Sequence, residues 1–161
     1  MARVERSADA RFAGTDLDWL GSADPTPSEL LAPYCDAGTA WLIANEGGQP
    51  TGFLVAGMRE DQFVIFQISV ALDQQGHGLG KQLMMAALNA ARRLGARQAV
   101  LTTYRDIAWN APWYARFGFR EVAKDDQSPA LASMLANEAA SGHDPARRCA
   151  MALDLAAGKA T

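Results

Sequence analysis

The sequence predicts an α/β fold (α+β by some conventions), with a mixed, mostly antiparallel central sheet and helices on both faces. The main observation is an apolar stretch at 63–72 that leads through a glycine-rich turn into an amphipathic helix at 80–94, and then into an apolar stretch at 98–103. This order indicates a strand-helix-strand crossover. Two earlier strand-like stretches, 39–44 and 51–58, are separated by a Gly- and Pro-containing turn and predict antiparallel hairpins.

The two ends of the chain complete the predicted elements. Residues 3–20 have the apolar spacing of a helix, and a second short helix follows a proline-containing break, from Ser28 to Gly38. Near the other end, a helix is expected at 131–140, and alternating apolar residues predict a last strand at 148–155.

Length and composition predict one domain over residues 1–161. Hydrophobic residues make up 49% and charged residues 20%, as in an ordinary soluble enzyme. The net charge of −3 argues against a nucleic-acid partner, and no apolar run is long enough for a membrane span. The charged N-terminus does not resemble a signal peptide, so we expect a cytoplasmic protein. Cys35 and Cys149 lack metal-ligand spacing, and we expect two reduced core thiols and no metal.

The glycine-rich turn predicts a binding site for a phosphate or pyrophosphate. It reads Gln75-Gly76-His77-Gly78-Leu79-Gly80 and is followed by Lys81. Glycines allow the backbone to approach a ligand closely, and the N-terminus of the following helix favours an anion. A P-loop is excluded because Gln75 stands in place of its first glycine and Gln82 in place of its hydroxyl residue. The spacing also differs from the dinucleotide-binding G-x-G-x-x-G.

A second motif follows the strand at 98–103. It reads Trp109-Asn110-Ala111-Pro112-Trp113-Tyr114-Ala115-Arg116-Phe117-Gly118-Phe119. Pro112 suits the first turn of a helix and Gly118 suits its end, so a short helix is expected here. The loop pattern Q-x-x-G-x-G and the pattern N-x-x-x-Y-x-x-x-G-F together resemble the GNAT superfamily of acetyl-CoA-dependent N-acetyltransferases, in a bacterial branch. The clear resemblance covers residues 63 to 122.

The resemblance implies an acyltransferase that moves an acetyl group from acetyl-CoA to a primary amine by direct attack. It implies that Tyr114 protonates the leaving thiolate as general acid and that Asn110 binds the pantetheine or orients the thiol. The pantetheine arm would pair with the backbone of Ile68, Ser69 and Val70. The main chain of the loop would bind the pyrophosphate, through Gln75, Gly76, His77, Gly78, Leu79, Gly80 and Lys81. We expect the His77 ring to face solvent, and the Lys81 side chain either to be solvated or to touch a phosphate.

The general base is not identified by the sequence. Residues 62–72 contain no carboxylate, and Phe66 stands where related sequences carry an acidic residue. Proton removal would fall to ordered water, to Glu60 or Asp61, or to Asp106. We expect the acceptor to be a small-molecule amine rather than a protein N-terminus. The alternatives are a non-catalytic acyl-CoA-binding or regulatory domain and, third, an unrelated nucleotide-binding protein.

The start of the chain departs from the family pattern. GNAT domains usually begin with a strand, whereas this sequence begins with helix-like residues. We therefore expect the first strand to be missing. Either the sequence starts short of that strand, or the exposed sheet edge is covered by another segment or by a second subunit, as in a homodimer.

Overall fold

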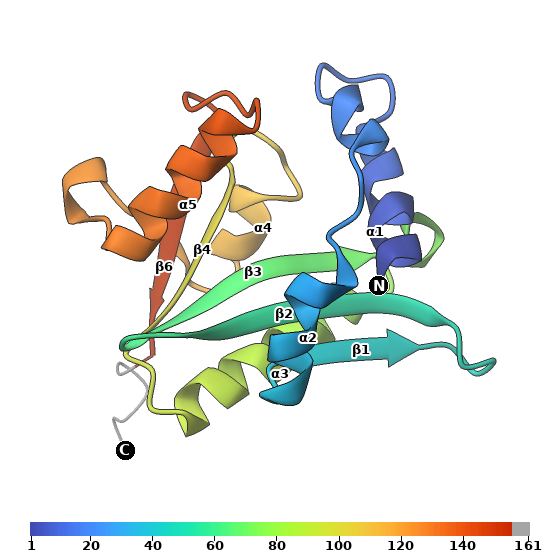
Figure 1. Ribbon diagram of the computed structural model, residues 1–161, viewed down its shortest axis with the longest axis horizontal. Helices are drawn as coiled ribbons and strands as arrows, with labels where there is room; N and C mark the ends of the chain where they lie inside the picture. Colours follow the sequence, from blue (N-terminus) through green and yellow to red (C-terminus); the bar gives the residue numbers. More distant parts are fainter. Residues whose placement is uncertain (156–161) are drawn as a thin grey trace. The chain divides into compact units, whose positions relative to one another are not determined.

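The computed structural model describes residues 1–155 (Figure 1) and contains one mixed sheet. Its six strands have the order β1-β2-β3-β4-β6-β5. The β1–β2, β4–β6 and β5–β6 pairs are antiparallel, whereas β3 and β4 pair in parallel. The predicted mixed α/β sheet is confirmed. The strands are β1 (Ala40–Ala44), β2 (Pro50–Arg59), β3 (Gln62–Val70), β4 (Gln98–Tyr104), β5 (Arg120–Glu121) and β6 (Arg148–Asp154).

Five α-helices and four short 3-10 turns connect these strands within residues 1–155. The α-helices are α1 (Ala2–Asp9), α2 (Ser28–Asp36), α3 (Leu79–Arg93), α4 (Ala111–Ala115) and α5 (Pro129–Ala140). The 3-10 turns are η1 (Ala10–Phe12), η2 (Asp18–Ser22), η3 (Leu72–Gln74) and η4 (Lys124–Asp126). None of the helices in this range has the length and apolar character that crossing a membrane requires.

The chain forms two compact units, which we describe separately. The first consists of Met1–Gly57 and Phe66–Ala90, and the second of Met58–Ile65 and residues 91–155. The first unit therefore contains α1, α2, the glycine-rich turn and most of α3. The second contains β4, α4, α5 and β6.

In the first unit, helices lie on both faces of β2. A Cβ atom on Gly57 would lie 2.9 Å from Cε1 of Tyr34 in α2. A Cβ atom on Gly52 would lie 3.3 Å from Cδ1 of Leu83 in α3. The two glycines are separated by an odd number of positions, so they point to opposite faces of the strand. At each of these two positions a helix packs closely against β2, and glycine leaves the space that the helix side chain occupies.

In the second unit, β4 also has polar contacts on both faces. Thr102 donates a hydrogen bond of 2.6 Å to Glu138 of α5, and its neighbour Thr103 donates one of 2.8 Å to Asn110, the residue before α4. Adjacent strand residues point to opposite faces, so α5 and the start of α4 lie on different sides of β4.

The predicted elements are found with two exceptions, and one prediction about a cysteine was wrong. The helix expected at 3–20 ends at Asp9 and gives way to 3-10 turns, with Gly14 at φ +75°. The two-residue strand β5 was not predicted, because a pairing this short leaves no alternation to detect. Cys149 is buried as expected, but the prediction of a core thiol was wrong for Cys35, which is exposed at the end of α2.

Candidate active site

The glycine-rich turn forms an open backbone cradle in the first unit. Gly76 and Gly78 both have φ +82°, in the left-handed region that other residues adopt only at a cost. A Cβ atom on either glycine would meet no atom within 4 Å. The glycines are therefore required by the backbone conformation rather than by packing, and the space above them remains open to a ligand.

The start of α3 supplies backbone donors directly after this cradle. The first backbone hydrogen bond at this end runs from Gln82 N to Gly78 O, at 3.1 Å. The N–H groups of Leu79, Gly80 and Lys81 therefore precede the ladder of the helix and point toward its N-terminus. Together with the helix dipole, they form an arrangement suited to a phosphate or pyrophosphate.

Gln75 fixes the loop in place. Its side-chain amide donates a hydrogen bond of 3.0 Å to the carbonyl of Val70, and its Oε1 accepts one of 2.6 Å from Arg11. The loop is thus attached both to the end of β3 and to η1. The exposed His77 ring has Nδ1 at 3.2 Å from the Gln74 carbonyl, and Lys81 is exposed.

The pleat of β3 is interrupted just before this loop. The Phe66 ring packs against Tyr34, with ring centroids 5.0 Å apart, on the face covered by α2. Val70 Cγ2 would lie 3.4 Å from a Cβ on Gly52, on the face covered by α3. Residues four apart share a face in a regular strand, so the alternation must break between Phe66 and Val70. The segment predicted to bind pantetheine, Ile68, Ser69 and Val70, lies within this interruption.

The parallel pairing of β3 is also short. Its register joins Gln62–Val64 to Gln98–Val100 and includes only the first residues of β3. The backbone of Ile68–Val70 is outside this register.

Asn110 is fixed by its neighbours in the second unit. Its Oδ1 accepts the hydrogen bond from Thr103, which is 2% exposed, and its carbonyl accepts from the N–H groups of Trp113 and Tyr114. The oxygen of the side-chain amide is therefore occupied by the protein. The two N–H groups of the same amide make no hydrogen bond within residues 1–155, and they can serve as donors to a ligand.

Tyr114 is buried, and its ring has aromatic neighbours. The ring packs edge-on against Trp113 and Phe119, with centroids 5.0 and 6.0 Å away. Within residues 1–155 the hydroxyl makes no hydrogen bond. Burial raises the pKa of Tyr114 to about 12, against the opposing charge of Arg148. The phenol is therefore protonated throughout the neutral range.

Comparison with known proteins decides the family. The profile of the acetyltransferase (GNAT) family matches residues 12–119, which include both the glycine loop and Tyr114. The chain belongs to this family. It is an acetyltransferase, and acyl transfer from acetyl-CoA is its general activity.

Individual relatives agree with this assignment. The chain is 28% identical over 126 residues to the uncharacterized N-acetyltransferase YjgM of Escherichia coli K12, covering 76% of this chain and 75% of that protein. Its fold is similar to the ribosomal-protein-S18-alanine N-acetyltransferase of Escherichia coli (TM-score 0.62, 17% identity, 96% and 84% of the chains). It is also similar to N-acetylglutamate synthase of Neisseria gonorrhoeae, solved with coenzyme A and N-acetyl-glutamate (TM-score 0.64, 16% identity, 81% and 28%).

Three carboxylates were considered from the sequence as general bases. In the structure two of them form ion pairs and the third is exposed in a turn. Asp61 forms an exposed ion pair with Arg97 at 3.2 Å, and Asp106 forms one with Arg147 at 2.8 Å. Glu60 is an exposed turn residue at φ +54°. No group of three or more potential metal ligands is present within residues 1–155.

The sequence analysis did not identify several buried or paired polar residues in either unit. In the second unit, Arg148 makes a bidentate pair with Glu138 at 2.7 and 2.8 Å, and Tyr104 Oη lies 2.7 Å from Nδ1 of His143. Burial and Arg148 lower the pKa of His143. In the first unit, Glu5 is buried on α1. Nothing in the spacing of these residues distinguishes them from exposed charges, because their partners come from distant parts of the chain.

Proposed function

We propose that this acetyltransferase transfers the acetyl group of acetyl-CoA to a primary amine by direct attack, with Tyr114 as the general acid. The observation that carries the proposal is the state of Tyr114. Its ring is fixed by aromatic neighbours, its hydroxyl makes no hydrogen bond within residues 1–155, and its raised pKa keeps the proton on the oxygen. A phenol in this state can give its proton to a thiolate as that thiolate leaves.

The glycine loop supports acetyl-CoA as the co-substrate. The cradle of Gly76 and Gly78 and the N–H groups at the start of α3 fit the pyrophosphate, with Gln75, His77, Leu79, Gly80 and Lys81 contributing main-chain atoms. The backbone of Ile68, Ser69 and Val70 would hold the pantetheine arm as an added strand. Acetyl-CoA supplies the acetyl group as an activated thioester.

Asn110 is proposed to orient the thioester end of this arm. Its side-chain oxygen is committed to Thr103, so the amide can present only its N–H groups to a ligand. An amide donor suits the carbonyl oxygens of pantetheine. In this role Asn110 binds, whereas Tyr114 moves a proton.

The acceptor is proposed to be a small-molecule amine. One structural neighbour was solved with a small compound whose amino group carries the acetyl group, N-acetyl-glutamate. Another neighbour is named for an alanine of a ribosomal protein, so the acceptors of the neighbours include both classes. The alternative is an acyl-CoA-binding domain without turnover. That alternative is favoured by one observation, the lack of any carboxylate in β3 from Gln62 to Val70.

Ligand binding and turnover test the proposal together. Thermal-shift titrations should be run with acetyl-CoA, CoA, ATP and NAD in parallel. A ligand at about 100 times its dissociation constant stabilises its protein by about 2.7 kcal/mol. We expect shifts with acetyl-CoA and CoA only, and thiol release from acetyl-CoA when primary amines are added. Binding without thiol release from any amine would favour the non-catalytic alternative, and shifts with ATP or NAD alone would refute the loop assignment.

A further inference from the structure

Strand β1 forms one edge of the sheet of residues 1–155, and its one neighbour there is β2. The Ala56 N–H donates to the Thr39 carbonyl at 3.0 Å, and Thr51 Oγ1 donates to the Ile43 carbonyl at 3.3 Å. The carbonyls of Thr39 and Ile43 therefore face β2. In an antiparallel pair, successive residues of a strand turn their N–H and C=O groups to opposite sides. The residues whose backbone groups point out of the sheet edge are Ala40, Leu42 and Ala44.

This edge lacks the charges and the proline that usually protect an exposed strand. The strand reads Ala-Trp-Leu-Ile-Ala over residues 40–44. Charged side chains, prolines and very short strands normally keep a sheet edge from pairing with another chain. The opposite edge of the sheet follows this rule, because β5 has two residues, and both, Arg120 and Glu121, are charged and exposed. β1 is thus the edge that is suited to accept a further strand.

A large apolar side chain lies at the centre of β1. Leu42 is 51% exposed, although Phe53, its partner across the β1–β2 pair, is fully buried. Figure 1 shows β1 at the outer margin of the sheet, beyond β2. An added strand would cover the Leu42 side chain and pair with the outward-pointing backbone groups at the same time.

The sequence of β1 is suited to pair with a second copy of itself. A two-fold axis at Leu42 would place this residue opposite its own copy in an antiparallel pair. The same register places Trp41 opposite Ile43 of the second copy. At the ends of the strand it places Ala40 opposite Ala44. Large side chains therefore meet large ones and small meet small, and an aromatic residue opposite a β-branched one is a favourable cross-strand pair.

The backbone groups match in this register as well. Residues that exchange both N–H···O bonds across an antiparallel ladder alternate with residues that exchange none. The pairs of Leu42 with its copy and of Ala40 with Ala44 are formed by the residues whose backbone groups point outward. A register shifted by one residue would place outward-pointing groups opposite residues that face β2, so it would not form a ladder.

We propose that two copies of this chain pair antiparallel through β1, with Leu42 on the two-fold axis, and form a homodimer with a continuous sheet. This inference gives the homodimer expected from the sequence a specific interface. It goes beyond the proposed function and does not depend on the reaction.

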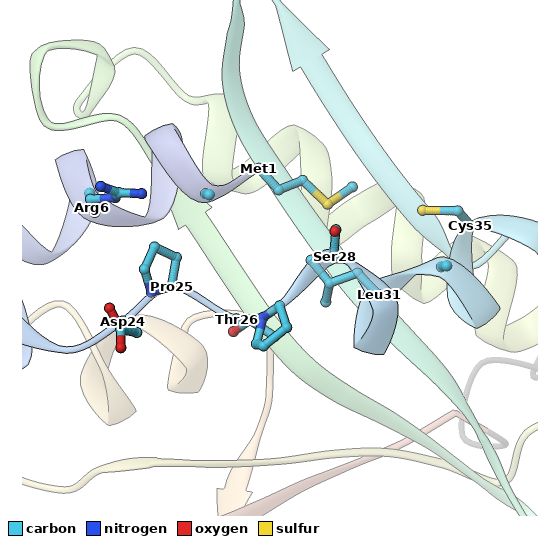
Figure 2. Close-up of a pocket in the computed structure, with 11 residues that line it drawn as sticks. Met1, Arg6, Asp24, Pro25, Thr26, Ser28, Leu31 and Cys35 are labelled. Carbon is cyan, nitrogen blue, oxygen red and sulfur yellow. The ribbon is translucent and has the colours of Figure 1, made fainter.

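The proposed interface leaves the binding features of the first unit open. The glycine-rich turn follows β3, and β2 separates β3 from β1 in the sheet order. A cavity of about 530 Å³ lies beside α1 and α2, where Figure 2 shows Arg6, Thr26 and Cys35 among its lining residues. None of its lining residues belongs to β1. Each copy in the dimer would therefore keep its own site.

Sedimentation equilibrium of the purified chain over about a hundredfold range of concentration tests the proposal. We expect the fraction of dimer to rise with concentration. Leu42→Lys brings two ammonium groups together at the axis, so it should raise the dissociation constant of the dimer by about tenfold or more. Leu94→Lys is the matched control, because Leu94 is 52% exposed and directly follows α3, outside β1. It should dimerise like the wild type.

A second variant removes a backbone donor instead of a side chain. Leu42→Pro deletes the outward-pointing N–H of the central residue but no hydrogen bond to β2, which is the one kind of position where a strand tolerates proline. We expect this variant to keep the circular dichroism spectrum of the wild type and to lose the dimer.

Cross-linking tests the register. The Cα atoms of a hydrogen-bonded antiparallel pair are about 5.5 Å apart, a distance that a disulfide spans. The variants are made in a Cys35→Ser background, which removes the exposed native thiol. Leu42→Cys should then form a covalent dimer on mild oxidation. Ala44→Cys should not, because four strand residues, about 13 Å, separate its two copies along the strand.

Three results would overturn the inference. One is a wild type that stays monomeric at the highest concentration, and another is a dimer that Leu42→Lys leaves intact. The third is a dimer that Ala44→Cys cross-links and Leu42→Cys does not. None of these measurements uses acetyl-CoA or an amine, so their failure would leave the proposed function untouched.

Discussion

Thr103 donates a 2.8 Å hydrogen bond to the side-chain oxygen of Asn110, and it thereby determines which end of that amide a ligand can meet. Thr103 is nearly fully buried on β4, and Asn110 stands at the start of α4. Through this hydrogen bond, β4 orients the side chain of Asn110, a residue of the proposed active site. The two residues are close in sequence, but only the structure shows that their side chains meet.

Removing this hydroxyl should impair turnover without disrupting the fold. Thr103→Val preserves the shape of the side chain but leaves Asn110 Oδ1 without its donor, at a cost of about 1 to 3 kcal/mol in unfolding free energy. The freed amide can rotate, so we expect a lower kcat/KM as well. Thr103→Ser retains the hydroxyl and should stay close to the wild type. Equal kcat/KM values for Thr103→Val and the wild type would argue against a role for Asn110 in the reaction.

A methyl group on the glycine loop should weaken acetyl-CoA binding specifically. In Gly78→Ala the backbone keeps φ near +82° at a cost of about 1 to 2 kcal/mol, and the methyl group occupies the open side of the cradle. Gly48→Ala is the matched control, since Gly48 has φ +74° and equally open surroundings in the β1–β2 turn. Both variants should lose similar stability. Only Gly78→Ala should raise the dissociation constant of acetyl-CoA, by about tenfold or more, as measured by calorimetry.

Asp9 should make the wild-type fold less stable as the pH rises. Its pKa is 3.8 in a model compound and about 6 in the folded protein, so the folded state holds the proton more tightly. The free energy of unfolding therefore falls as the pH rises from about 4 to about 6, and the full cost is present above that range. Because the side chain is only partly buried, we expect Asp9→Asn to stabilise the protein at pH 7 by about 1 to 2 kcal/mol.

Denaturant titrations of Asp9→Asn and the wild type at pH 4 and pH 7 test the predicted direction of this pH dependence of stability. The advantage of the variant should be present at pH 7 and nearly absent at pH 4. A difference that does not depend on pH would mean that the carboxyl is not perturbed in the folded state.

The ion pair of Glu138 and Arg148 should be important for stability. Their side chains are only 21% and 11% exposed, so Glu138→Gln leaves a largely buried guanidinium without its counter-charge. We expect a loss of about 2 to 4 kcal/mol in unfolding free energy. The pair of Arg105 and Glu121, with side chains 45% and 46% exposed, gives the control, because Glu121→Gln should cost about 1 kcal/mol or less. Similar losses of unfolding free energy in Glu138→Gln and Glu121→Gln would show that burial does not determine how much each ion pair stabilises the fold.

The sequence was sufficient to predict most elements because their patterns are local. The crossover through α3 is visible from the apolar runs at each side of the glycine loop, and Gly95 ends the helix at φ +76° as expected. The short helix α4 follows from Pro112 in its first turn, but it ends at Ala115, three residues before the Gly118 that was expected to end it. These features depend on backbone preferences that a few neighbouring residues determine.

The residues that the sequence did not reveal depend on contacts between distant segments. Glu5 looks like an ordinary helix charge until Thr26 and Gln67 are brought next to it. The pKa of Asp9 likewise depends on burial, which no local pattern specifies. The predicted core position of Cys35 failed for the same reason, since α2 turns this residue outward.

The turnover number of Tyr114→Phe tests the central claim most directly. It should be measured as CoA thiol release with a primary amine that the wild type accepts, alongside the dissociation constant for acetyl-CoA. Loss of the hydroxyl removes the general acid and nothing from the aromatic packing, so we predict a fall in kcat of about 100-fold or more with unchanged acetyl-CoA binding. A variant that retains the kcat of the wild type would contradict the proposed mechanism.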